Sequence, residues 1–137
     1  MKLSFYCSNN NLTSLEGCPE KIPEIFICSN NNLTTLEGAP KEVGRVFSCD
    51  KNKLTSLKGC PKKVSKDFEC QYNELTSLEG GPKEVSRDFN CGNNKLTSLE
   101  GCPKEVGGDF DCEHNQGKKF TKSDIENVCK VSGSIRV

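Results

Sequence analysis

The chain repeats one pattern every 21 residues. A phenylalanine and a cysteine two residues apart recur at this interval, as Phe5/Cys7, Phe26/Cys28, Phe47/Cys49, Phe68/Cys70, Phe89/Cys91 and Phe110/Cys112. The full unit is F-x-C-x-x-N-x-L-T-S-L-E-G-(C/A/G)-P-K-E-V, present five times and followed by a truncated sixth copy. Strict self-similarity at such a period indicates a solenoid, in which successive units stack along one axis.

The composition agrees with a stacked chain. Only 33% of the residues are apolar, which is low for a compact globular core, but stacking lets a few apolar residues per unit form continuous columns. The formal net charge is zero, from 19 basic and 19 acidic side chains, which argues against a nucleic-acid binder that works through a generally basic surface. The chain has neither a long apolar run typical of a membrane span nor the apolar stretch of a secretory signal near its start. We therefore expect a cytoplasmic protein with no membrane partner.

The unit predicts short strands joined by bends. Its phenylalanine and cysteine lie at positions i and i+2, so they point to the same side of a strand, here the interior. The asparagine column, which includes Asn52 and Asn73, is expected to hydrogen-bond backbone groups at the bend after each strand. The E-G-x-P-K-E-V segment is too short and too rich in glycine and proline for an α-helix, so extended or turn-like backbone is expected there.

The repeat resembles that of leucine-rich repeat proteins over residues 3–115. The phenylalanine and cysteine occupy the L-x-L strand of L-x-x-L-x-L-x-x-N/C-x-L, and the asparagine falls on its N/C position. The P-x-x-V step is similar to the short-backed bacterial repeats of secreted effectors, although the catalytic domain that some effectors carry has no counterpart here. The stretch LTSLEGCPKEVGGDFDC looks still more like short repeat proteins encoded by bacteriophages, including their C-terminal helical tail. This resemblance implies a leucine-rich-repeat-like fold and, for a phage protein, the host cytoplasm.

The fold class predicted is therefore a mainly β repeat solenoid with a parallel sheet on one face, extended or turn-like backs and a short C-terminal capping helix. Residues 1–115 form the solenoid and residues 116–137 form the cap. Within the cap, Ser123-x-x-Glu126 has the pattern of a capping box, and Ile125, Val128 and Cys129 share one helical face. A helix is expected over about 122–129, followed by a last strand within residues 130–137.

The first repeat has no such covering segment. It leaves a strand edge open, and an open edge invites pairing with another chain. We predict a homodimer through the N-terminal repeat.

The ten cysteines allow three interpretations: disulfides, a zinc site and packing. Disulfides are rare in the cytoplasm, and the usual zinc-ligand pairs are missing because the chain has one histidine, His114, and no C-x-x-C. A second cysteine position is occupied by Cys18, Ala39, Cys60, Gly81 and Cys102 in successive units. This position requires a small side chain rather than a sulfur ligand, so packing is favoured. Cys112 and His114 remain a weak candidate for a metal or nucleophilic pair, and we predict no enzyme, no metal site and no cofactor.

The residues beside the phenylalanine and cysteine point outward onto the sheet, which is the usual binding surface of a solenoid. This surface is apolar in the first three units and acidic in the last three. The residues predicted to bind a partner are Tyr6, Ile25, Ile27, Val46, Ser48, Asp67, Glu69, Asp88, Asn90, Asp109, Asp111 and Glu113. Adjacent exposed apolar residues usually mark an interaction site, and complementary charge selects the partner.

The function expected from this pattern is a non-catalytic protein-protein interaction module. Its partner would be a cytosolic protein with a basic surface, such as a host defence or regulatory protein if the phage resemblance holds. Direct nucleic-acid binding is not expected. Two alternatives remain: an acidic mimic of nucleic acid that occupies a nucleic-acid-binding protein, or a self-assembling structural protein that pairs through its N-terminal edge.

Overall fold

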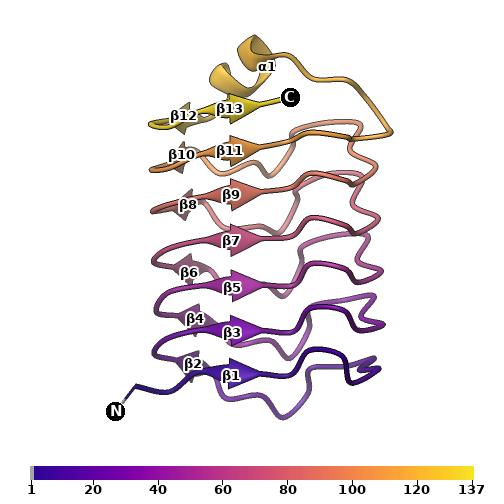
Figure 1. Ribbon diagram of the computed structural model, residues 1–137, viewed down its shortest axis with the longest axis vertical. Helices are drawn as coiled ribbons and strands as arrows, with labels where there is room; N and C mark the ends of the chain where they lie inside the picture. Colours follow the sequence, from indigo (N-terminus) through magenta and orange to yellow (C-terminus); the bar gives the residue numbers. More distant parts are fainter. Residues whose placement is uncertain (1) are drawn as a thin grey trace.

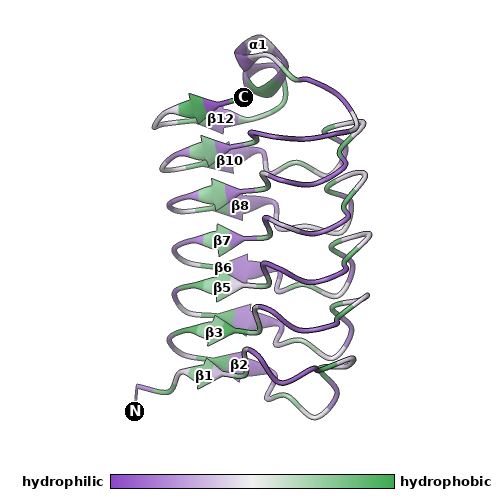
Figure 2. Ribbon diagram, turned by 45° about the vertical axis from the view of Figure 1, so that its right-hand side comes forward, coloured by the Kyte–Doolittle hydropathy of each residue, from purple (hydrophilic) through white to green (hydrophobic). Residues whose placement is uncertain are grey.

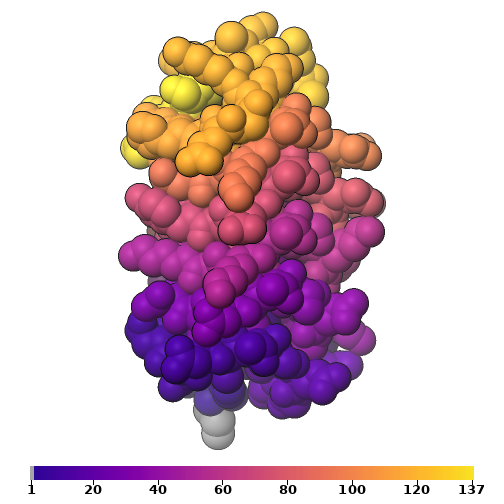
Figure 3. Space-filling model, turned by 90° about the vertical axis from the view of Figure 1, so that its right-hand side faces the viewer, coloured from indigo at the N-terminus to yellow at the C-terminus, as the bar shows by residue number. Residues whose placement is uncertain are grey.

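The computed structural model describes residues 2–137 and consists of stacked coils with a parallel sheet on each side (Figure 1). The predicted solenoid is confirmed. Figure 3 shows the coils as successive layers, with the C-terminal segment covering one end of the stack.

The front sheet contains one strand from each phenylalanine–cysteine segment. Its strands, in spatial order, are β1 (Phe5–Tyr6), β3 (Phe26–Ile27), β5 (Phe47–Ser48), β7 (Phe68–Glu69), β9 (Phe89–Asn90), β11 (Phe110–Asp111) and β13 (Ile135–Arg136). All neighbours are parallel, and phenylalanine pairs with phenylalanine from β1 to β11. The 21-residue repeat thus sets the register, because a shift would remove the phenylalanine from the interior.

The backs form a second parallel sheet, which is more regular than the extended or turn-like backbone predicted. This back sheet contains β2 (Lys21–Ile22), β4 (Glu42–Val43), β6 (Lys63–Val64), β8 (Glu84–Val85), β10 (Glu105–Val106) and β12 (Lys130–Val131). In each strand from β2 to β10 the second residue, isoleucine or valine, is buried and the first is exposed. Backbone groups at the back therefore pair between coils, as buried backbone groups require.

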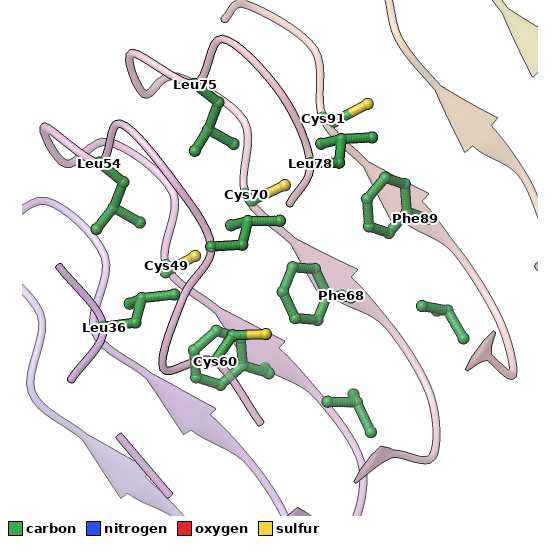
Figure 4. Close-up of a cluster of buried hydrophobic side chains, with 14 of the residues drawn as sticks. Leu36, Cys49, Leu54, Cys60, Phe68, Cys70, Leu75, Leu78, Phe89 and Cys91 are labelled. Atoms are coloured by element: carbon green, nitrogen blue, oxygen red, sulfur yellow. The ribbon is translucent and has the colours of Figure 1, made fainter. Parts of the chain in front are cut away.

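The core lies between the two sheets as columns of identical side chains. Neighbouring phenylalanine rings in the column from Phe5 to Phe110 have centroids 5.2–5.7 Å apart. Cysteines and leucines form parallel columns beside them, as Figure 4 shows for the central coils. Hydrophobic residues recur at the same place in each coil, so they form rows along the stack (Figure 2).

The asparagine column hydrogen-bonds backbone groups at the bend after each front strand, as predicted, and these bonds also join each coil to the preceding one. The Oδ1 of Asn73 accepts the Leu54 N–H at 3.0 Å, and its Nδ2 donates to the carbonyls of Cys49 and Cys70 at 3.1 and 3.2 Å. Equivalent bonds are made by Asn31, Asn52, Asn94 and Asn115. One amide thus satisfies backbone groups of two coils at a bend that the sheet ladder does not reach.

A left-handed residue precedes each of these asparagines. Asn9, Asn30, Lys51, Tyr72, Asn93 and His114 have φ between 53° and 60°. Asparagine adopts this conformation most readily among residues with a side chain, whereas a tyrosine or lysine is strained there. His114 therefore occupies a bend position of the repeat.

The capping box lies two residues earlier than predicted, and the helix ends at Glu126 instead of near residue 129. The helix α1 spans Lys122–Glu126, and the box is formed by Thr121 and Asp124 rather than by Ser123 and Glu126. Ile125 is fully buried over the core and Cys129 is nearly so, whereas Val128 is 46% exposed and lies off the predicted face. The tail provides two strands, β12 and β13, each of which adds to one sheet.

We expect Asn73→Ala to lower the free energy of unfolding by about 2–3 kcal/mol, because it leaves buried backbone groups of two coils without partners. The matched control is Asn10→Ala. Asn10 occupies the same repeat position, but its side chain donates only to the Ser8 carbonyl. Asn10→Ala should lower the free energy of unfolding, measured by urea denaturation, by less than about 0.5 kcal/mol. Equal losses in the two variants would contradict the role assigned to the amide bridge.

We expect Gly59→Ala to cost about 1–3 kcal/mol more than Gly17→Ala, because added volume in a packed contact forces the backbone to shift. Both glycines have φ of +89°, so the conformational cost of alanine is shared. A Cβ on Gly59 would lie 2.7 Å from backbone atoms of Leu36 and Glu37, whereas nothing lies within 4 Å of a Cβ on Gly17. Thermal or urea denaturation of the two variants measures the cost of placing a Cβ between neighbouring coils. Similar stabilities of the two variants would show that the contact between coils at Gly59 carries no such cost.

Candidate functional site on the front sheet

All twelve residues predicted to bind a partner lie in or beside the strands of the front sheet. They lie in two columns, before and after the phenylalanine, with Glu113 in a third column after the cysteine. The structure brings them together on one side of the solenoid (Figure 1).

The apolar part of this surface is smaller than predicted. Tyr6 is 65% exposed, but Ile25, Ile27 and Val46 are half-buried. Their side chains belong to columns in which each residue is flanked by the residue of the next coil, and this contact removes much of their surface from water. Tyr6 is therefore the principal apolar contact that the first coils offer.

The centre of the surface is a packed polar network rather than a set of free side chains. Ser48 was predicted to be exposed, but it is 2% exposed and its hydroxyl donates to Asp50 Oδ1 at 2.7 Å. The same Asp50 oxygen accepts the Ser29 hydroxyl. Beside this network lies Gln71, whose Oε1 is buried without a hydrogen-bond partner among residues 2–137. Asp50 and Gln71 were not among the predicted binding residues, although their position directly after the column cysteine indicated that they share this face.

The aspartates before the phenylalanine have an internal role. Asp67 Oδ1 accepts the Asp88 N–H at 3.1 Å, and Asp88 Oδ1 accepts the Asp109 N–H at 2.8 Å. Asp109 Oδ1 then accepts the Ser134 N–H at 2.8 Å. This column joins successive coils at the bend before each front strand, as the asparagines do at the bend after it. The three aspartates are therefore structural as well as partly exposed.

The last front strand places a cation beside the acidic residues. Arg136 lies 3.8 Å from Asp109 and 3.5 Å from Asp111. Sequence reasoning missed this arginine because β13 pairs with β11 at an offset of 25 residues, outside the 21-residue register. Asn90, in the same column as Asp111, accepts the Gly92 N–H through its Oδ1.

Glu69, Asp88 and Asp50 have no cationic side chain within 4.0 Å among the residues that the structure describes. Burial raises the pKa of the Glu69 carboxyl, and the negative charges of Asp50, Asp67 and Asp88 reinforce this shift. The C-terminal half of the front sheet thus has unneutralised negative charge on a rigid surface. We call Glu69, Asp88, Asp111 and Glu113 the acidic face. Asp111 lies beside Arg136 and Glu113 beside His114, so Glu69 and Asp88 are its carboxylates without a neighbouring cation.

The cysteine column forms part of the coil-to-coil contacts. The Cys7 thiol lies 3.5 Å from the Ile27 carbonyl, and Cys28, Cys49, Cys70 and Cys91 approach the next coil in the same way. Burial, reinforced by nearby Cys18, raises the pKa of Cys7 to about 11, and burial raises that of Cys60 to about 12. These thiols are therefore protonated at neutral pH and unreactive as nucleophiles.

Cys112 and His114 have different surroundings and different neighbours. Cys112 is buried and its sulfur accepts the Asn115 amide, whereas the His114 side chain is 74% exposed and lies 3.9 Å from Glu113. Within residues 2–137 no group of three or more histidine, cysteine or carboxylate side chains is arranged to hold a metal ion.

Comparisons with protein-family models, with curated proteins and with solved structures gave no match. Among residues 2–137, none of the helical segments is long and apolar enough to cross a membrane.

We expect Glu69→Gln to stabilise the protein at pH 7 and to have less effect near the pKa of a free carboxyl. Because the native pKa of Glu69 is raised, the folded state binds more protons than the unfolded state, and stability falls as the pH rises through its titration. Glutamine does not titrate, so the variant does not lose stability in this way. The difference in the free energy of unfolding between the variant and the wild type should therefore grow with pH in a urea denaturation series. Glu74→Gln, at an exposed site beside Lys95, serves as the control. An advantage of Glu69→Gln that does not change with pH would contradict the assignment.

Proposed function

We propose that the protein is a non-catalytic protein-binding module that engages a partner with a basic surface through its front sheet. The observation that carries this proposal is the acidic face, in which Glu69 and Asp88 have no cationic neighbour within the described chain. A solvated surface needs polar groups, but it does not need a carboxylate such as Glu69 at a position where burial disfavours its charge. A cationic partner would offset the cost of keeping this carboxylate charged. The front sheet would therefore bind a basic protein in preference to an acidic one.

The rigidity of the surface supports the same proposal. The strands of the front sheet are fixed by backbone pairing and by the phenylalanine column behind them, so their outward side chains are held in place before a partner arrives. Preorganised contacts lose less entropy on binding than mobile ones. Tyr6 would supply an apolar contact at the opposite end of the same surface, since aromatic residues are frequent interface anchors.

The test uses variants that keep the shape of the acidic face and remove charge. Glu69→Gln with Asp88→Asn retains an oxygen that can accept the Asp109 N–H. This double variant should lose most of its affinity for a synthetic oligolysine peptide in calorimetry and should no longer retain the proteins captured from lysate by the wild type.

The control is Glu74→Gln with Glu79→Gln, which removes the same charge outside the front sheet. It should bind as the wild type does. Ile27→Asp, tested separately, should weaken capture through the apolar part of the surface. Unchanged binding by the acidic-face variant, or an equal loss in the control, would overturn the proposal.

A further inference from the structure

The two sheets of the solenoid have opposite charge in the C-terminal coils. The back sheet has a lysine directly before each strand from β4 to β10, namely Lys41, Lys62, Lys83 and Lys104. The front sheet has the acidic face on the other side of the core (Figure 1). The formal net charge of zero therefore conceals a separation of charge across the thickness of the molecule.

The lysines of the back sheet are not neutralised within the described chain from the third coil onward. In the first coils, Lys41 pairs with Glu20 at 3.2 Å and Lys21 pairs with Glu42 at 3.5 Å. Lys62, Lys83 and Lys104, which we call the lysine column, have no carboxylate within 4.0 Å among residues 2–137. The reason lies in the repeat: Glu20 occupies the first position of this column, and every later neighbour is another lysine.

Lys63 and Lys130 add positive charge to the same surface, while Glu84 and Glu105 subtract from it. From Lys62 to Val131, the back strands and the residue before each contain five lysines and two glutamates, a net excess of three positive charges. Glu79 and Glu100, at the bends before these strands, lie outside this count. Like charges stacked about 4.8 Å apart repel one another unless opposite charge is supplied from outside.

The front and back sheets share the same coil spacing because every coil contributes one strand to each. The distance between successive lysines of the column therefore equals the distance between successive coils of the acidic surface. Several lysines of one copy can then face carboxylates of another copy at the same time. Each copy of this chain therefore has two parallel sheets with the same spacing between coils.

We propose that the back sheet of one copy packs against the front sheet of a second copy, with the lysine column on the acidic face. This inference rests on the proposed function, since it assigns a second copy of this chain as the cationic partner of the front sheet. The interface joins two different surfaces, so a pair of copies still has one free front sheet and one free back sheet. The contact can therefore propagate into open-ended layers.

Sedimentation at low and high salt tests the assembly directly. At about 0.01 M salt the Debye length is about 30 Å, and at about 1 M it is about 3 Å, so contacts between exposed charges are favoured only in the first condition. The wild type should grow in mass with concentration at low salt and sediment as a monomer at high salt. A monomer at every concentration in low salt would overturn the proposal.

Variants identify the faces. A lysine variant, Lys62→Gln with Lys83→Gln and Lys104→Gln, should weaken self-association by about tenfold or more. A carboxylate variant, Glu69→Gln with Asp88→Asn, Asp111→Asn and Glu113→Gln, should do the same while keeping the side-chain oxygens that accept backbone N–H groups. The matched control, Lys53→Gln with Lys95→Gln and Lys118→Gln, removes as much positive charge from other surfaces and should assemble as the wild type does.

Mixing the two face variants is the sharpest measurement. The lysine variant keeps a working front face and the carboxylate variant keeps a working back face, so the mixture can form one interface and should stop at a one-to-one dimer. Continued growth of the mixture, no association in it, or an equal loss in the control would each overturn the assignment of faces.

The oligolysine peptide separates this proposal from the proposed function. The lysine variant retains the acidic face and should still bind the peptide. Peptide binding by a protein that never self-associates would overturn only the self-assembly. Loss of both peptide binding and self-association in the wild type would overturn the two proposals together.

Discussion

The side-chain amide of the asparagine column is the contact on which the stack depends. Each strand is only two residues long, so the sheet ladders alone leave most of each coil's backbone at bends. At the bend after the front strand, Asn73 bonds a backbone N–H of the preceding coil and carbonyls of both coils, and its counterparts repeat this along the molecule. Without such bridges the buried bend would expose unpaired groups to an apolar core, at a cost of about 1–3 kcal/mol for each group.

Close approach of the coils explains the other invariable features of the repeat. The glycine column has positive φ and leaves no room for a Cβ against the backbone of the preceding coil, except at Gly17. The column cysteines fill small spaces and approach the carbonyls of the next coil, and burial raises the pKa of Cys7 and Cys28 among them. The aspartates at 67, 88 and 109 make a second side-chain ladder at the opposite bend. Residues that resemble reactive or binding groups in the sequence thus contribute mainly to stacking.

The surface available for recognition consists of the side chains that contacts between coils do not cover. Ser48, Asp50 and the isoleucines of the first coils are covered by their neighbours along a column, while Tyr6, Glu69 and Asp88 keep their contact with solvent or lack a counter-charge. On the other side of the core the lysine column is equally unpaired. The proposed binding surface and the proposed self-assembly both follow from charges that the repeat places in columns and the fold does not neutralise.

The sequence by itself determined the solenoid, the register of its front sheet, the inward phenylalanine and cysteine columns and the bridging role of the asparagines. Each of these follows from a 21-residue period, which makes every coil the neighbour of an identical one. Only the tertiary structure decided that the backs form a second sheet, that Ile25, Ile27 and Val46 are half-buried, that Ser48 is buried, and that Arg136 lies beside Asp111. The extent to which a side chain is covered depends on the size and conformation of the residues one coil above and below it. The position of Arg136 depends on a strand whose offset of 25 residues leaves the repeat, so no periodicity in the chain could reveal it.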